Sequence, residues 1–212
     1  MAHEFKTLSS ELLLDAPIIA VRRDEVVMPD DHVAYREVVE HLGAVAVVAL
    51  NESNQIAMVN QYRHSVGRRL WELPAGLLDV AGEDELSGAK RELMEEAGLA
   101  ASSWSVLTDL VTSPGFCEET ARVYLAQILS EVERPEAIGD EEADMDFAWV
   151  GIDDAVAKIF AGEISNSIAV SGILAAAQVI SGKAEPRSVD ESFELRPTSI
   201  AARRKGPDLK KQ

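Results

Sequence analysis

The chain has 212 residues, 47% hydrophobic and 27% charged, which is enough to bury one well-packed core. Its formal net charge of −17 argues against a protein that grips nucleic acid through phosphate contacts. No stretch approaches the roughly 20 consecutive apolar residues of a membrane span, and residues 1–17 lack the pattern of a secretory signal. The single cysteine, Cys117, excludes an internal disulfide and fits a reducing compartment. We therefore expect a cytoplasmic protein that binds neither nucleic acid nor membrane.

Residues 1–41 alternate short β-prone runs with turn material. The runs are separated by Asp15–Pro17 and Pro29–Asp31, and they cover Phe5–Leu14, Ile18–Met28 and His32–His41. They predict a small antiparallel sheet beside the main domain. Because so small a sheet rarely stands alone in water, we expect it to dock onto another surface, a second subunit being one candidate.

The pattern changes at Gly43, after which the apolar run Ala44–Leu50 predicts a strand buried on both faces. Further strands are expected at Gln55–Tyr62, Trp104–Thr112, Ala121–Leu129 and Phe147–Val150, and helices at Glu83–Ala97, Asp153–Ala161 and Ser167–Ile180. Such alternation without regular βαβ spacing predicts the α/β class, as an α/β/α sandwich around a mixed sheet. We expect three parts: an N-terminal sheet domain at 1–41, a main domain at 42–183, and a tail at 184–212 that is either frayed or clamped onto the surface.

The most informative of these segments is the helix predicted at Glu83–Ala97. At about 100° per residue, one apolar stripe must face a core, and it consists of Leu86, Ala89, Leu93 and Ala97. Glu92 and Glu96 lie one turn apart beside the stripe, and Glu95 lies a step further round. Like charges at this spacing cost a helix a few tenths of a kcal/mol per pair. The cluster therefore suits either a solvated face or a site for hard cations such as Mg²⁺ or Mn²⁺. Gly98 is expected to end the helix.

The whole string from Gly76 to Leu99 resembles the Nudix box, in which a glycine and a glutamate precede Arg-Glu-apolar-x-Glu-Glu-x-Gly-apolar. Every fixed position is matched, by Gly76, Glu83, Arg91, Glu92, Leu93, Glu95, Glu96, Gly98 and Leu99. The departure is one extra residue, six rather than five, between Gly76 and Glu83. An insertion in the loop before the helix leaves the register of the helix intact. The resemblance implies cleavage of a diphosphate by a metal-activated water.

The resemblance also carries roles to the matching positions. It implies that Glu92 and Glu96 are ligands of Mg²⁺ or Mn²⁺, with Glu95 in the same cluster. The backbone carbonyl of Ala75, just before the box, would be another ligand. The two remaining charged positions of the box, Glu83 and Arg91, would be structural and tie the loop to the helix.

Segments outside the box are similar to those of bacterial ADP-ribose pyrophosphatases, namely Tyr35–Glu40, Gln61–Arg63, Trp71–Gly76 and Ser113–Phe116 with its Pro114. This similarity implies a small-molecule nucleotide sugar, ADP-ribose, as substrate, and a homodimer with exchanged N-terminal sheets. By match, Arg63 would hold a phosphate and Glu72 would line the cleft. Arg36 and Glu37 would frame the pocket, from their own subunit or from the partner. For these strand residues an ordinary surface ion pair is the alternative. We expect Phe116 to be a core residue rather than a platform for a stacked base.

The acidic segment Glu131–Asp146 reads on its residues alone as a solvated loop. In similar enzymes a glutamate on this loop deprotonates the attacking water, which implies Glu142 as the general base and Glu141 as the near alternative. The expected reaction is ADP-ribose plus water giving AMP and ribose 5-phosphate. The alternatives are a Nudix hydrolase of another nucleoside-diphosphate sugar or a dinucleoside polyphosphate, and a sensor that binds ADP-ribose without cutting it.

Overall fold

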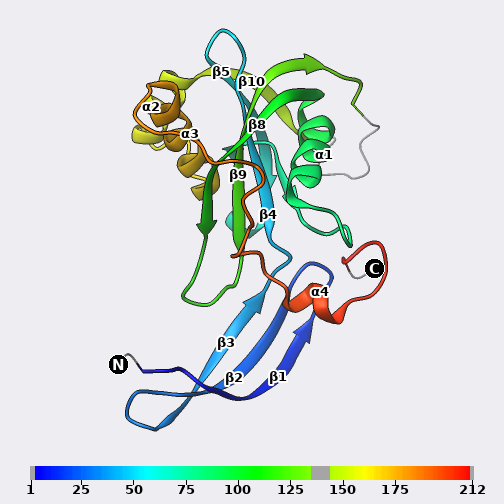
Figure 1. The fold of residues 1–212 in the computed structure, drawn as a ribbon, viewed down its shortest axis with the longest axis vertical. Helices are drawn as coiled ribbons and strands as arrows, with labels where there is room; N and C mark the ends of the chain where they lie inside the picture. The colour runs from blue at the N-terminus through cyan, green and yellow to red at the C-terminus, as the bar shows by residue number, and fades with distance from the viewer. Residues whose placement is uncertain (1–2, 135–143, 211–212) are drawn as a thin grey trace.

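The computed structural model describes residues 3–134 and 144–210, and it joins a small N-terminal sheet to a larger body (Figure 1). The small sheet has three antiparallel strands in the order β1-β2-β3, with β1 at Thr7–Asp15, β2 at Ala20–Val27 and β3 at Val33–Glu40. The expected small antiparallel sheet is therefore confirmed.

The body is built on two sheets. In the larger one, β4 (Ala44–Ala49) runs parallel to β9 (Thr120–Glu131) and antiparallel to β7 (Ala75–Leu77). Strand β8 (Leu99–Val111) pairs antiparallel with β9 and completes the order β7-β4-β9-β8. The second sheet has the order β10-β5-β6, formed by β10 (Asp146–Gly151), β5 (Gln55–Arg63) and β6 (Arg68–Glu72). Parallel and antiparallel pairs in one sheet confirm the predicted mixed character.

Strand β4 is fully buried because helices cover both of its faces. Val45 and Val47 belong to the core that contains Ala89 and Leu93 of α1 (Glu85–Ala97). Alternate residues such as Val48 face the other core, with Ile173 of α3 (Ser167–Ile180) and residues of α2 (Ile152–Phe160). Figure 1 shows α1 on one side of the strands and α2 with α3 on the other. The α/β/α sandwich predicted from the sequence is confirmed.

Several elements differ from the prediction. Strands β6 and β7, the 3-10 turn η1 (His64–Val66) and the short helix α4 (Ser199–Arg203) were not expected. The tail is clamped rather than frayed, because Phe193, Ile200 and Leu209 are all buried. Within the ranges that the structure describes, no helix combines the length and apolar character needed to cross a membrane.

Candidate active site

Helix α1 begins and ends at residues whose chemistry fixes its limits. The Asp84 carboxylate accepts a hydrogen bond from the backbone N–H of Ser87 at 2.9 Å and so caps the first turn. Gly98 ends the helix in the left-handed region, at φ 65°. Because Ala89 and Leu93 are buried in the core below, the edge that carries Glu92 and Glu96 lies against β7.

Glu92 and Glu96 are buried although both are carboxylic acids, with 9% and 8% of their surface exposed. Oε2 of Glu96 accepts a hydrogen bond from the backbone N–H of Ala75 at 2.9 Å. The Glu92 carboxylate lies directly against Gly76, in space that a Cβ would fill. Burial raises the pKa of Glu92 to about 7 and that of Glu96 to about 8. Burial therefore destabilises the ionised form of both carboxyl groups, and a nearby positive charge would stabilise it.

Arg91 is the positive charge that the chain itself supplies at this edge. Its guanidinium donates to Glu83 at 3.1 Å, to Glu92 at 2.6 Å and to Glu95 at 3.0 Å. The ion pair with Glu83 ties the loop before α1 to the helix, as the resemblance to the Nudix box implied. The same guanidinium neutralises part of the acidic edge.

The donor atoms at this edge fit a hard divalent cation in their chemistry. Two buried carboxylates with raised pKa values lie beside Ala75, whose carbonyl is a further oxygen donor, and oxygen ligands are what Mg²⁺ and Mn²⁺ prefer. In residues 3–134 and 144–210 no group of three or more His, Cys, Asp or Glu side chains is already arranged to hold a metal ion. One carboxylate oxygen of Glu92 and one of Glu95 instead accept hydrogen bonds from Arg91.

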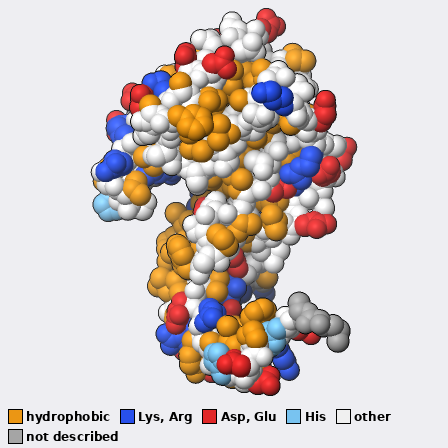
Figure 2. Space-filling model, turned by 90° about the vertical axis from the view of Figure 1, so that its left-hand side faces the viewer, with side chains coloured by type: hydrophobic (Ala, Val, Ile, Leu, Met, Phe, Trp, Pro, Cys, Tyr) orange, Lys and Arg blue, Asp and Glu red, His pale blue; other side chains and the backbone are white. Residues whose placement is uncertain are grey.

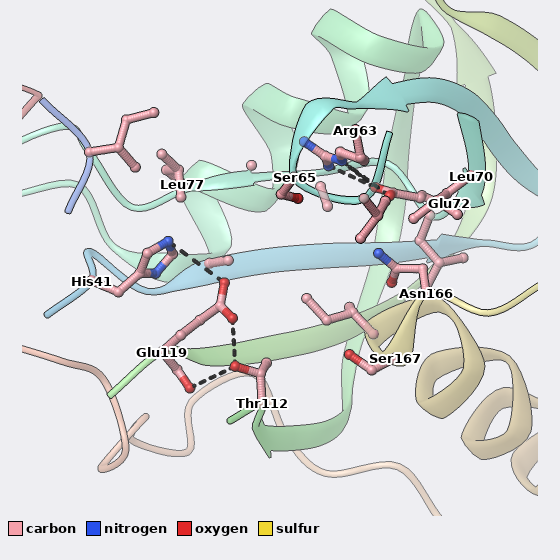
Figure 3. Close-up of a pocket in the computed structure, with 17 residues that line it drawn as sticks. His41, Arg63, Ser65, Leu70, Glu72, Leu77, Thr112, Glu119, Asn166 and Ser167 are labelled. Atoms are coloured by element: carbon pink, nitrogen blue, oxygen red, sulfur yellow. Dashed lines mark hydrogen bonds and ion pairs between the residues drawn. The ribbon is translucent and has the colours of Figure 1, made fainter. Parts of the chain in front are cut away.

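A pocket of about 450 Å³ opens beside this edge. It is lined by Ile18, His41, Ala44, Arg63, Ser65, Val66, Leu70, Glu72, Leu73, Ala75, Gly76, Leu77, Thr112, Glu119, Asn166, Ser167 and Ile168. The structure thus brings together four residues that the sequence singled out, Arg63, Glu72, Ala75 and Gly76. Glu72 is 2% exposed and accepts from Arg63 at 2.7 Å, a pair that Figure 3 shows on one side of the pocket. The Arg63 side chain is 40% exposed, and the buried carboxylate beside it holds its guanidinium in place.

The opposite side of the pocket carries a polar group that sequence reasoning missed. His41 lies 3.6 Å from the Glu119 carboxylate, which also accepts from the Thr112 hydroxyl at 2.5 Å (Figure 3). Burial lowers the pKa of His41, against the opposing effect of the Glu119 charge. Glu119 follows the motif Ser113–Phe116, which was noted for its Pro114. Nothing in that motif indicates a role for Glu119.

Three other predictions on site residues have different outcomes. Arg36 and Glu37 lie on β3 and do not line this pocket; Glu37 accepts from Arg23 at 2.8 Å. Phe116 was expected in the core, which is wrong, because 60% of it is exposed. Glu141 and Glu142 lie outside the described residues.

Comparison with known proteins agrees with this geometry. Residues 40–169 match the NUDIX domain family, and residues 5–39 match the nucleoside diphosphate sugar hydrolase N-terminal domain. An ADP-ribose pyrophosphatase of Mycobacterium tuberculosis is 56% identical over 95% of this chain and 97% of its own length. An ADP-ribose pyrophosphatase of Bacillus subtilis is 35% identical over 76% of this chain and 86% of its own length.

A solved structure gives the same result for the fold alone. The crystal structure of an ADP compounds hydrolase aligns with a TM-score of 0.75 and 18% identity, covering 86% of this chain and 97% of that one. The box, the fold and the family match agree, and the chain belongs to the Nudix family.

Proposed function

We propose that this Nudix hydrolase cleaves the diphosphate of ADP-ribose to AMP and ribose 5-phosphate with the help of a divalent cation. The choice of substrate rests on the similarity to two ADP-ribose pyrophosphatases. The similarity to the first covers nearly the full length of both proteins. The pocket of about 450 Å³ beside the acidic edge of α1 supports it, because this is ample volume for a nucleotide sugar.

In this proposal Glu92, Glu96 and the carbonyl of Ala75 hold Mg²⁺ or Mn²⁺, and Glu95 completes the cluster. The cation, when bound, would offset the charge of the diphosphate and lower the pKa of the attacking water. Offsetting that charge matters in a chain of net charge −17, which otherwise repels an anionic substrate.

The remaining roles belong to side chains around the pocket. Arg63, fixed by the buried carboxylate of Glu72, would bind a phosphate oxygen. Glu142, with Glu141 as the near alternative, would take the proton of the attacking water, a contribution of about 10²–10⁴-fold for a general base.

We further propose a cytoplasmic homodimer in which the sheet of residues 1–41 is exchanged and brings Arg36 and Glu37 to the partner's pocket. Large apolar side chains are exposed along this sheet, among them Leu8, Leu12, Leu14, Val33 and Tyr35. Figure 2 shows hydrophobic side chains on the narrow lower part of the molecule and a hollow where this part meets the body. Burying such side chains against a second copy would stabilise a dimer.

Product identification tests the proposed reaction. Purified protein incubated with ADP-ribose and Mg²⁺ or Mn²⁺ should release AMP and ribose 5-phosphate, and Glu96→Gln should lose metal binding and activity together. Faster product release from another nucleoside-diphosphate sugar or from a dinucleoside polyphosphate would show that this compound, and not ADP-ribose, is the preferred substrate. Tight binding of ADP-ribose in calorimetry without turnover would indicate a sensor instead.

A further inference from the structure

The loop that carries the extra residue of the box is covered by residues 207–210, which we call the strap. The backbone N–H of Ala81 donates to the carbonyl of Pro207 at 2.9 Å, and the N–H of Leu209 donates to the carbonyl of Asp79 at 2.7 Å. Val80 and Asp208 form an antiparallel bridge between these two bonds. The lengthened loop therefore has a specific backbone partner within the chain.

The side chain of Asp79 is buried between two cations. Asp79 is 7% exposed; its Oδ2 lies 2.5 Å from Nζ of Lys210 on the strap, and its Oδ1 lies 3.7 Å from Nη2 of Arg91 on α1. A buried carboxylate that loses one of its cations must find another partner or move toward water. Lys210 and Arg91 thus compete for one carboxylate, and Lys210 holds it at the shorter distance.

Arg91 divides its bonds between the loop and the acidic edge. Toward the loop it meets Glu83 and Asp79, and toward the edge it binds Glu92 and Glu95. A cation that binds Glu92 must compete with this guanidinium. The cation displaces Arg91 from Glu92 more easily when Asp79 and Glu83 of the loop bind the guanidinium strongly.

The strap has a second anchor on the opposite side. Leu209 is 4% exposed and packs with Ala20, Leu42, Ile200 and the β7 residue Leu77. Arg204 donates to the carbonyl of Leu209 at 2.8 Å and to the Asp15 carboxylate at 2.7 Å. The strap therefore lies fixed between the N-terminal sheet and the strand that carries Ala75 and Gly76.

We propose that the strap is a positioning element for the acidic edge: Lys210 neutralises Asp79, Arg91 is therefore drawn less strongly toward the loop and stays on Glu92, and this limits the affinity of Glu92 for a divalent cation. The proposal rests on the metal site of the proposed function. Lys210 touches neither substrate nor cation, and it acts through Asp79 and Arg91.

The test is a calorimetric titration with Mn²⁺ alone, run on three variants. Lys210→Gln should lower the dissociation constant for Mn²⁺ at least threefold, because Asp79 then draws Arg91 away from Glu92, while kcat at saturating Mn²⁺ stays within twofold. Lys210→Arg should restore the wild-type constant. Lys158→Gln is the matched control, because Lys158 forms an equally short ion pair of 2.5 Å with Glu163, outside this network, and it should leave the constant unchanged.

Unchanged Mn²⁺ affinity in Lys210→Gln, or an equal shift in Lys158→Gln, would overturn the proposal. A variant that ends at Gly206 gives a second measurement: a merely structural strap would lower its Tm and leave the Mn²⁺ constant of the folded protein unaltered. The titration contains no nucleotide, so a wild-type protein that binds Mn²⁺ but does not cleave ADP-ribose would remove the proposed reaction and leave this inference standing.

Discussion

Gly76 lies directly against the carboxylate of Glu92: a Cβ on Gly76 would fall 2.0 Å from the carboxyl carbon. Gly76 is not among the glycines with positive φ, so backbone freedom does not explain the residue. The requirement is space. Without a side chain here, β7 approaches α1 closely enough for the N–H of Ala75 to reach Glu96 at 2.9 Å. The glycine of the box and its glutamates therefore form one packed unit.

Gly76→Ala should disrupt this unit. The added methyl forces Glu92 away from β7, and overpacking of this kind costs about 1–3 kcal/mol. We expect that loss in the free energy of unfolding, measured in urea, and at least a tenfold weaker Mn²⁺ affinity in calorimetry. Gly115→Ala is the control for stability, because a Cβ at Gly115 meets nothing within 4 Å. Wild-type Mn²⁺ affinity in Gly76→Ala would contradict the close packing described above.

The raised pKa values of Glu92 and Glu96 predict how stability varies with pH. Between about pH 4.5 and about pH 8 the folded, metal-free chain holds protons that the unfolded chain has released. The free energy of unfolding should therefore fall as pH rises through this window, by a few kcal/mol in all. Urea unfolding in a chelator at several pH values measures the slope.

Two comparisons assign that slope to the acidic edge. Glu96→Gln has one titrating group fewer, so its unfolding free energy should depend less on pH. Mn²⁺ should bind more tightly as pH rises, because binding requires the ionised carboxylates. The same slope in Glu96→Gln as in the wild type would place the titration elsewhere in the molecule.

The parts of the site that the sequence predicted depend on local signals. The C-terminal limit of α1 follows from a terminal glycine, and its buried face follows from apolar spacing along one helix. Its start was predicted at Glu83, two residues early, because the cap by Asp84 was not recognised. Strands β6 and β7, with five and three residues, are too short to show a period. Sequence patterns therefore predict elements whose structure is determined by residues close together in the chain.

What the sequence did not predict depends on contacts between distant segments. The loop before Glu119 pairs with β3 through its backbone, where the N–H of Val39 donates to the carbonyl of Phe116 at 2.7 Å. That pairing leaves the Phe116 ring outside the core and places Glu119 beside His41. Neither result has a local signature, because the partner strand lies far away in the sequence.

Glu142→Gln should separate proton transfer from metal binding. If Glu142 is the general base, kcat for ADP-ribose should fall at least tenfold, while calorimetric Mn²⁺ affinity stays within twofold of the wild type. Glu141→Gln is the matched control on the adjacent residue and should retain most of the activity. A near-normal rate in Glu142→Gln with a large loss in Glu141→Gln would exchange the two roles, and normal rates in both would move the base elsewhere.

Arg122 should be the residue on which the attachment of the C-terminal tail depends most. It is 1% exposed, its guanidinium binds the Asp109 carboxylate at 2.8 Å, and it donates to the carbonyls of Glu191 and Ser192 at 2.7 and 2.9 Å. It also lies over the Phe193 ring, 4.7 Å from the centroid. Arg122→Met leaves two carbonyls without this donor and the half-buried Asp109 carboxylate with one cation fewer, so we expect a loss of about 1–3 kcal/mol in the free energy of unfolding.

Arg187 provides the control for that prediction, because it binds the same Asp109 carboxylate at 2.9 Å from a side chain that is 38% exposed. An exposed pair contributes less than about 1 kcal/mol, so Arg187→Gln should change stability little. Limited proteolysis should cut residues 184–195 faster in Arg122→Met than in Arg187→Gln. Equal losses in the two variants would mean that the ion pair with Asp109, and not the buried bonds to the tail carbonyls, holds the tail in place.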